Sequence, residues 1–324
     1  MIARLGAAIL ALAAGVGGVV VAVLLLQSEP GPVSSGATTA APAVTTTVAG
    51  GQIPTPTDPG FPAPPPGALV LAREAGTRAL ALAIVPGDES SLVRVSVLSG
   101  QGPGARGLAV SILAGGQTVL LPACGAGCYQ SDVPTSRLSG KVVVMLDARG
   151  YPFTLPSTLS LPAGTAMVAN AGKVWRALKT LVWHERLAAS PTDALYTVYR
   201  AVAPDELQYT IGGHSSALII GMNRWDRATP TGRWVHSVQN PPITQPQPFW
   251  AGQSDAHVIA SGRVDGRSAA EITFFDPVTP AWFDAWIDKR NGHTLVLTMT
   301  AVAHFMHHVY GPFDAPFQLH PPAA

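Results

Sequence analysis

The fold is decided by a stretch that reads Tyr199-Arg200-Ala201-Val202-Ala203-Pro204-Asp205, then Tyr209-Thr210-Ile211, then Ile219-Ile220-Gly221-Met222-Asn223-Arg224-Trp225. An aromatic and β-branched run ends at Ala-Pro-Asp, a second run follows at once, and a third turns at Gly221 toward Trp225. Short runs of this kind, separated by Pro, Asp and Gly, are typical of antiparallel strands joined by tight turns. The stretch therefore predicts successive hairpins within one sheet.

The strand pattern continues on both sides of this stretch. Gly212-Gly213-His214-Ser215-Ser216 is expected to form a hairpin, and Asn291-Gly292 another, because a type I′ turn needs positive φ at both central residues. Asp276, Asp284 and Asp288 are expected around turns, where Asp is favoured. Strands are expected at residues 180–189, 195–201, 206–211, 217–220, 223–226, 233–237, 256–263, 269–275, 282–288 and 294–301.

One segment before these strands has a helical pattern. Residues 165–178 carry apolar side chains three or four positions apart, so they predict a helix that packs against a sheet through Met167, Val168, Val174, Trp175 and Leu178. A helix followed by a long run of antiparallel strands predicts that residues 159–324 form an unclosed antiparallel β-barrel with a capping helix.

Residues 68–158 predict a different β domain. Val93, Val95 and Val97 alternate with polar residues, as in a half-buried strand. Short strands with turn signals at intervals of about 8–12 residues are typical of a sandwich, and we expect an immunoglobulin-like β-sandwich. Its strands are expected at residues 79–85, 92–98, 108–113, 118–121 and 141–146.

The N-terminal region predicts a membrane anchor. Residues 6–26 are apolar and uncharged, which is long enough for a bilayer span of about 20 residues and longer than the roughly 7–15 apolar residues of a cleaved signal peptide. Arg4 favours a cytoplasmic amino end. We therefore expect residues 1–28 to form a signal anchor, a single-pass transmembrane helix. A cleaved signal peptide is the alternative and gives the same compartment.

The composition after residue 28 predicts a linker and excludes nucleic acid as a partner. Residues 29–67 are rich in Pro, Thr, Ala and Ser and predict an extended linker without a core. The two domains after it are expected to be extracytoplasmic, at the cell membrane and within the cell envelope. Lys and Arg number 20 against 19 Asp and Glu, without the basic stripe that nucleic-acid binding requires. Nucleic acid is therefore excluded as a partner.

The pattern of the second domain resembles the periplasmic lipoprotein-carrier superfamily. The resemblance covers about the last half of the chain and rests on the run ending Ala203-Pro204-Asp205, the strand after it and the hairpin from Ile220-Gly221 to Trp225. Further likeness lies in Thr273-Phe274-Phe275-Asp276, the Asn291-Gly292 turn, Met299, Phe313, Pro316 and Pro321-Pro322.

This resemblance implies an unclosed barrel capped by a helix, with an apolar cavity that takes acyl chains. Members of the superfamily bind lipid, carry lipoproteins or sense envelope stress. A tethered chain cannot shuttle between membranes, so the resemblance implies local capture, sensing or scaffolding here.

The first domain, around residues 122–129, is similar to sandwich domains that accompany bacterial copper-transport membrane proteins, although the many-helix module of those transporters does not occur in the sequence.

The cavity that the resemblance implies would be lined by large apolar side chains, as ligand pockets usually are. Most of the seven tryptophans are expected in the core, because Trp buries a large area. The expected lining residues are Trp183, Leu218, Ile220, Met222, Trp225, Phe274 and Met299.

A cluster near the C-terminus offers a metal site as an alternative. His304, Met306, His307 and His308 combine imidazole and thioether groups, which suit copper. His304 and His308 converge only in a helix, whereas His304 and Met306 share a face only in a strand. The spacing leaves both arrangements open, and a structural or solvent-facing role for these histidines is the other interpretation.

Cys124 and Cys128 are the only cysteines. In an oxidising compartment a structural disulfide is expected. A redox pair or a soft-metal site is the alternative.

Motifs for catalysis do not occur: the sequence has no G-x-S-x-G, no H-E-x-x-H and no phosphate-binding loop. We expect a membrane-anchored binding protein, not an enzyme, that captures a lipid or acylated partner in the half-barrel and uses the sandwich for contacts with an envelope protein. No cofactor is expected, unless copper binds. The alternatives are a copper-handling accessory protein and a structural envelope protein.

Overall fold

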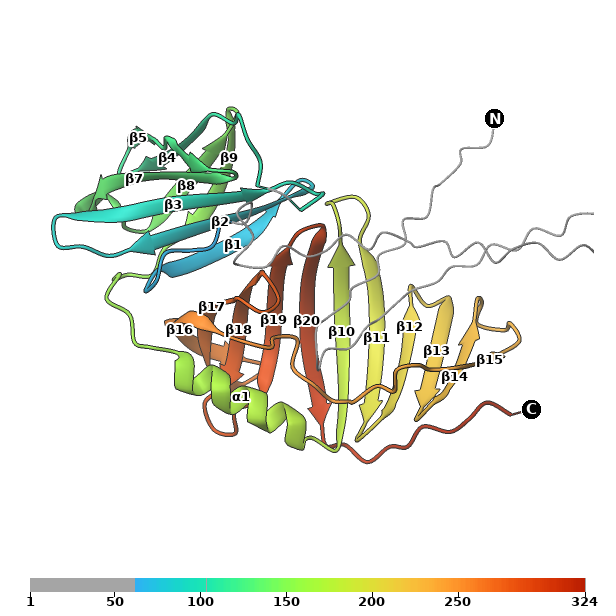
Figure 1. Cartoon of the computed structure of the whole chain (residues 1–324). Coiled ribbons are helices and arrows are strands. Elements are labelled where there is room, and N and C mark those ends of the chain that lie inside the picture. Colours follow the sequence, from blue (N-terminus) through green and yellow to red (C-terminus); the bar gives the residue numbers. More distant parts are fainter. Residues whose placement is uncertain (1–61, 103, 324) are drawn as a thin grey trace, which may run out of the picture.

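The computed structural model describes residues 62–102 and 104–323 and shows a mainly β protein, as the sequence predicted (Figure 1). Within these residues no helix is long and apolar enough to cross a membrane. The expected anchor at residues 1–28 and nearly all of the expected linker at 29–67 lie outside the described residues.

The first domain consists of two antiparallel sheets that enclose one core. Its strands are β1 (Leu69–Ala75), β2 (Arg78–Val85), β3 (Ser90–Leu98), β4 (Val110–Ala114), β5 (Gln117–Leu120), β6 (Ala123–Gly125), β7 (Cys128–Pro134), β8 (Lys141–Leu146) and β9 (Arg149–Thr154), with a 3₁₀ turn at Thr135–Arg137. The sheet orders are β1-β2-β3-β7-β6 and β5-β4-β8-β9. Because alternate residues of a strand point to the same side, Leu80, Leu82 and Ile84 of β2 meet Ile112 and Val144 of the other sheet.

The second domain is one unclosed antiparallel sheet, as predicted, and it has eleven strands where the sequence predicted ten, because β20 was not predicted. Its order is β15-β14-β13-β12-β11-β10-β20-β19-β18-β17-β16, so the first and last strands of the domain are neighbours at its centre. The strands are β10 (Thr180–Ala188), β11 (Leu195–Val202), β12 (Glu206–Ile211), β13 (Ser215–Ile220), β14 (Asn223–Arg227), β15 (Val235–Val238), β16 (Ser254–Val264), β17 (Arg267–Asp276), β18 (Ala281–Asp288), β19 (Thr294–Ala301) and β20 (His304–Phe313).

One face of this sheet, the inner face, is covered by α1 (Thr165–Ala177). Val168, Ala171 and Trp175 are buried on one side of the helix, which ends where Leu178 adopts an extended conformation. The predicted helix at 165–178 is confirmed. Figure 1 shows α1 across the β16–β20 half of the sheet and the blue and green sandwich beside the same half.

Two turns of the second domain differ in how well they follow the prediction. The hairpin expected at Gly212-Gly213-His214 joins β12 to β13. The hairpin expected at Asn291-Gly292 joins β18 to β19, and Gly292 has φ 75°. The predicted type I′ turn is wrong, because Asn291 is not among the residues with positive φ and the backbone closes farther out, from Asp288 N to His293 O at 2.8 Å.

The opposite, outer face of the sheet packs against the first domain. Directly opposed residues of neighbouring strands point to the same side of a sheet. Five such residues form what we call the docking row: Ala188, Phe305, Thr300, Trp282 and Phe275.

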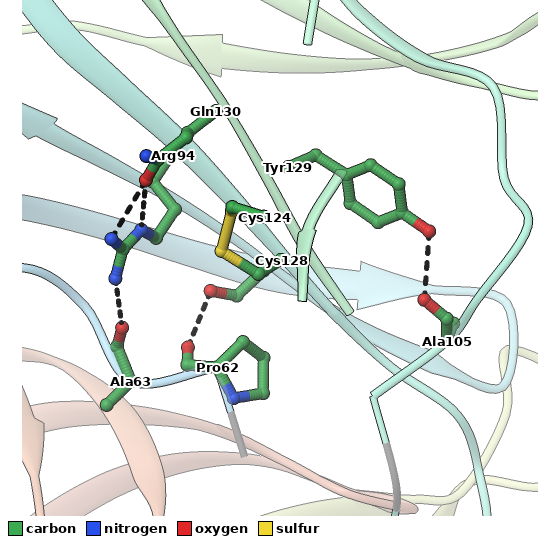
Figure 2. The surroundings of a disulfide bond; sticks show 9 residues. Pro62, Ala63, Arg94, Ala105, Cys124, Cys128, Tyr129 and Gln130 are labelled. Atoms are coloured by element: carbon green, nitrogen blue, oxygen red, sulfur yellow. Dashed lines mark hydrogen bonds between the residues drawn. A yellow bond between two sulfur atoms is a disulfide. The ribbon is translucent and has the colours of Figure 1, made fainter. Parts of the chain in front are cut away.

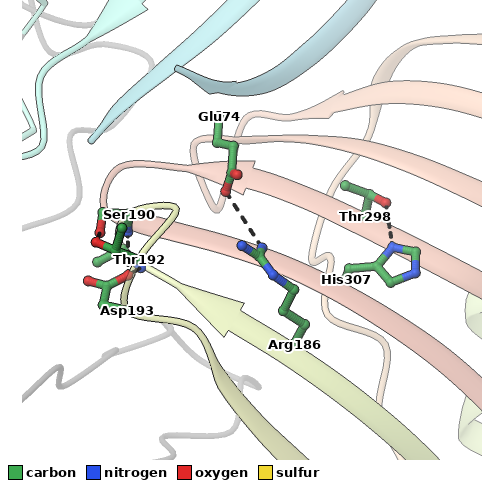
Figure 3. Close-up of polar contacts among 8 residues, drawn as sticks. Glu74, Arg186, Ser190, Thr192, Asp193, Thr298 and His307 are labelled. Carbon is green, nitrogen blue, oxygen red and sulfur yellow. Dashed lines mark hydrogen bonds and ion pairs between the residues drawn. The ribbon is translucent and has the colours of Figure 1, made fainter. Parts of the chain in front are cut away.

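The docking row meets a flat surface on the sandwich. Ala79, Ala81 and Ala83 occupy every second position of β2 and pack, with Ala68 and Val70, against the rings of the row. An ion pair between Glu74 and Arg186, 3.6 Å apart, lies beside this contact (Figure 3). Alanine at these positions lets large rings lie close to the strand.

Replacing Ala81 with Arg should separate the domains. Ala81 is 2% exposed, and overpacking a buried site costs about 1–3 kcal/mol before the cost of a buried charge is added. Calorimetry should then resolve two unfolding transitions where the unaltered protein has one. Ala123→Arg, at an exposed position of β6, should keep the single transition. A81R with one transition would contradict the docking described here.

Candidate functional site

The inner face carries a continuous layer of aromatic side chains. Strands contribute Trp183, Tyr199, Phe274, Phe283 and Tyr310, which are all at most 6% exposed. Trp183 stacks on Tyr199 with ring centroids 4.5 Å apart, and Phe274 stacks on Phe283 at 5.0 Å. The inner face from β11 to β17 therefore presents an apolar surface that no second sheet covers.

Two segments fill the place of a second layer. The helix α1 inserts Trp175, and residues 239–253, which contain no helix or strand, insert Phe249 and Trp250. Trp175 packs edge-on against Tyr310, Phe249 and Trp250, with centroids 4.9, 6.3 and 6.3 Å apart. We call α1 and residues 239–253 the cover.

Hydrogen bonds fix the cover at several points, among them Gln245 N to Pro204 O at 2.8 Å and Gln253 Nε2 to Thr165 O at 3.0 Å. Trp175 Nε1 donates to Thr294 Oγ1 at 3.0 Å. The Asp276 carboxylate accepts from the backbone amides of Ala251 and Gly252 at 2.8 and 3.0 Å. Between these bonds, the cover is held by apolar contact of its aromatic side chains with the layer.

The structure brings together three of the seven predicted lining residues. Trp183, Phe274 and Met299 belong to the buried layer on the inner face. Leu218 and Trp225 are directly opposed to each other, and Ile220 shares their side, whereas Ala217 and Ile219 point inward. Leu218, Ile220 and Trp225 therefore lie on the side of the sheet opposite to the buried layer, because neighbouring residues of a strand face opposite sides. Met222 lies in a turn and is 54% exposed.

Sequence reasoning missed most of the side chains that face the cover. Tyr199, Phe283 and Tyr310 lie on the inner face in register with Trp183, Phe274 and Met299, and strand alternation would have found them. Phe249 and Trp250 carry no such signal, because their segment has no period.

A buried polar network crosses the inner face beneath the cover. Glu185 and His308 are directly opposed on β10 and β20, and His308 Nε2 lies 2.7 Å from Glu185 Oε2. His308 Nδ1 lies 2.6 Å from the Tyr310 hydroxyl, and the Tyr199 hydroxyl donates to Glu185 Oε1 at 3.1 Å.

The surroundings of this network keep its phenols protonated. Burial and then the negative charge of Glu185 raise the pKa of both Tyr199 and Tyr310 well above the ordinary value. His308 is fully buried with a partner on each ring nitrogen. The network therefore ties the central strands together and presents no reactive atom to solvent.

The predicted copper ligands divide between two faces, because their segment is strand β20. His304 Nε2 lies 2.9 Å from Met306 Sδ on the inner face. His308 shares that face but is held by Glu185 and Tyr310, and His307 points outward to Thr298 Oγ1 at 3.2 Å. Residues 62–102 and 104–323 hold no group of three or more His, Cys, Asp or Glu placed for a metal ion. Copper binding stays a prediction.

The predicted disulfide is confirmed in the first domain. Cys124 and Cys128 are bonded across the turn between β6 and β7, with Cα atoms 5.0 Å apart (Figure 2). The neighbouring Tyr129 hydroxyl donates to Ala105 O at 2.9 Å and ties a loop to the same strand. Both sulfur atoms are used in this bond, so neither is a thiolate that could bind a metal in this state, and the redox role stays a prediction.

Comparison with known proteins gives likenesses of fold only. No family model and no curated protein matches the sequence. Solved structures similar to this chain include LprF from Mycobacterium bovis, at 9% identity and TM-score 0.37, covering 51% of this chain and 100% of that one. A LolA superfamily protein from Nitrosomonas europaea is 9% identical with TM-score 0.25, covering 49% and 96%.

A DUF1329 family protein from Desulfovibrio piger is 8% identical with TM-score 0.26, covering 48% of this chain and 93% of that one. With TM-scores below 0.5, these likenesses carry no functional argument.

Buried His304 should make the protein less stable in acid. Burial lowers its pKa from 6.5 to about 4, with Glu185 opposing and His308 assisting. Between these values the unfolded chain binds a proton that the native state does not, so stability falls by about 1.4 kcal/mol per pH unit. Urea unfolding of His304→Gln should show a loss between pH 6.5 and 4.5 that is smaller by about 2–3 kcal/mol.

The exposed His214 provides the control for this measurement. His214→Gln, in the β12–β13 turn, should keep the pH dependence of the unaltered protein. Parallel stability curves for H304Q and the unaltered protein would contradict the assignment to His304.

Proposed function

We propose that this protein is a membrane-anchored, extracytoplasmic binding protein without catalytic activity, and that its half-barrel captures an acyl chain of a lipid or of an acylated partner. One observation carries the proposal. The inner face is an apolar, aromatic-lined surface that is covered only by α1 and the irregular residues 239–253.

The cover occupies the space that an acyl chain would take. Phe249 and Trp250 extend from a segment without ladder hydrogen bonds, and they contact Trp175, Trp183 and Phe274. Each methylene of an acyl chain that replaces them contributes about 0.8 kcal/mol of burial. Exchange of the cover for a chain therefore keeps the inner face away from water.

The remaining parts of the proposal rest on the sequence. The apolar run at residues 6–26 would hold the half-barrel near a membrane that supplies acyl chains. The pattern around Ala203-Pro204-Asp205 resembles a superfamily that binds lipid. The first domain would then face an envelope protein, with its disulfide stiffening the β6–β7 hairpin.

Photolabelling in native membranes tests acyl capture by the full-length chain. A diazirine analogue of palmitate should label peptides from β17, β18 and residues 239–253, besides residues 1–28 if these lie in the bilayer. Trp250→Ala opens space beneath α1 and should increase the labelling of β17 and β18 several-fold, because the competing side chain is gone. Peptides are quantified by mass spectrometry.

The matched control is Trp234→Ala. Trp234 stacks under Arg227, with its ring 4.6 Å from the guanidinium, and takes no part in the aromatic layer. This variant should label like the unaltered protein. Label confined to residues 1–28 in all three proteins would contradict acyl capture, and stoichiometric copper in the native mass would favour the copper-handling alternative.

A further inference from the structure

A cavity of about 330 Å³ lies between the two domains, on the outer face of the long sheet. On the sandwich side its walls come from β1 and from the chain around β9, and on the other side from β16 to β19. Sites for small organic molecules have volumes of this order. The docking row borders the cavity through Trp282 and Thr300.

One pleat away from the docking row, a polar row crosses the same face. Its directly opposed members are Thr273, Asp284, Thr298, His307 and Arg186. Arg186 pairs with Glu74 of the sandwich, and His307 Nδ1 bonds to Thr298 Oγ1, as Figure 3 shows. Thr273, Asp284 and Thr298 line the cavity. Asp284 thus lies within a strand and not at the turn that the sequence suggested.

Three polar atoms of residues that line the cavity have no hydrogen-bond partner: Thr273 Oγ1, Asp284 Oδ1 and Arg73 Nε. Thr273 is 2% exposed and its hydroxyl is unpaired, and Asp284 Oδ1 is likewise buried and unpaired. A buried polar group without a partner costs about 1–3 kcal/mol. Both oxygen atoms line a space large enough for a molecule that supplies what they lack.

The missing partner carries hydrogen-bond donors and positive charge. Burial, then the charge of neighbouring Glu271 and a hydrogen bond to it, raise the pKa of Asp284 to about 8. Burial raises the pKa of Glu271 as well. None of these influences is a cation. Arg73, which also lines the cavity, donates from Nη1 to Pro152 O at 2.6 Å, and its Nε has no partner.

We propose that this cavity binds a small organic amine, with its ammonium group between Asp284, Glu271 and Thr273 and its apolar body against Leu71, Leu155 and Trp282. An ammonium group donates three hydrogen bonds, which matches one oxygen from each of the three polar side chains. A hard metal ion would need six or more oxygen ligands or bound waters, whereas leucine, proline and aromatic side chains form much of the wall.

Binding of the amine releases a proton. Asp284, with its pKa raised to about 8, carries a proton at neutral pH that the ammonium group replaces. The other titratable groups facing Asp284 and Glu271 are Arg73 from β1, His307 from β20 and His257, which opposes Thr273 from β16; β9 and β19 contribute none to the lining. Affinity should therefore rise as the pH increases from 6 to 8.

Calorimetric titration of the full-length protein in a neutral maltoside detergent tests the proposal. Cyclohexylamine is the probe and cyclohexanol its uncharged counterpart. The amine should bind at least tenfold more tightly than the alcohol at pH 7. Its heat should differ between phosphate and Tris by the ionisation heat of about one proton, because the buffer takes up the released proton.

Variants locate the site. Asp284→Asn should weaken amine binding at least tenfold and abolish the proton release. Thr273→Val, which keeps the shape of the side chain, should weaken amine binding several-fold. Asp132→Asn, at an exposed position of β7, should change neither. Should D284N not fold, T273V still decides the matter. Equal binding of amine and alcohol, unaltered binding by T273V, or binding of Ca²⁺ in place of the amine would overturn the proposal.

Discussion

Burial of the docking row against the alanines of β2 determines how the rest of the molecule is arranged. Phe275 and Trp282 are 2% exposed and belong to one apolar cluster with Val70 of β1 and with Ala79, Ala81 and Ala83 of β2. The long sheet has apolar side chains on both faces, so it needs two layers of cover. The sandwich provides one, and α1 with residues 239–253 provides the other.

The sandwich on the outer face and the cover on the inner face differ in how they are built. The sandwich is a domain with its own core, and its contact with the sheet is extended by the ion pair between Glu74 and Arg186. The inner cover consists of one helix and an irregular segment. The outer layer is thus a folded domain, whereas the inner layer is two short segments of the same domain as the sheet.

Much of this fold could be predicted from the sequence, because Gly, Pro and Asp separate its strands and valines alternate in β3. Strands β7 and β9 were missed, since Gln130, Ser131 and Asp132 look polar and Gly150 and Pro152 look like a turn. The side that Leu218 and Ile220 face could not be chosen, because residues 217–220 are apolar on both sides. The cavity between the domains could not be predicted for a different reason. Thr273, Glu271 and Asp284 meet the sandwich only through packing between domains, which no local sequence pattern encodes.

The pairing of β10 with β20 joins the first and the last strand of the second domain. Glu185 and His308 bond across the middle of the sheet although they are 123 residues apart in sequence. Contacts between such distant segments form slowly, because a long loop must close first. A chain that emerges amino end first can complete its sandwich early, but β10 remains an open edge until residue 313 has been delivered. The half-barrel is thus completed by β20, and its assembly waits until that strand has been synthesised.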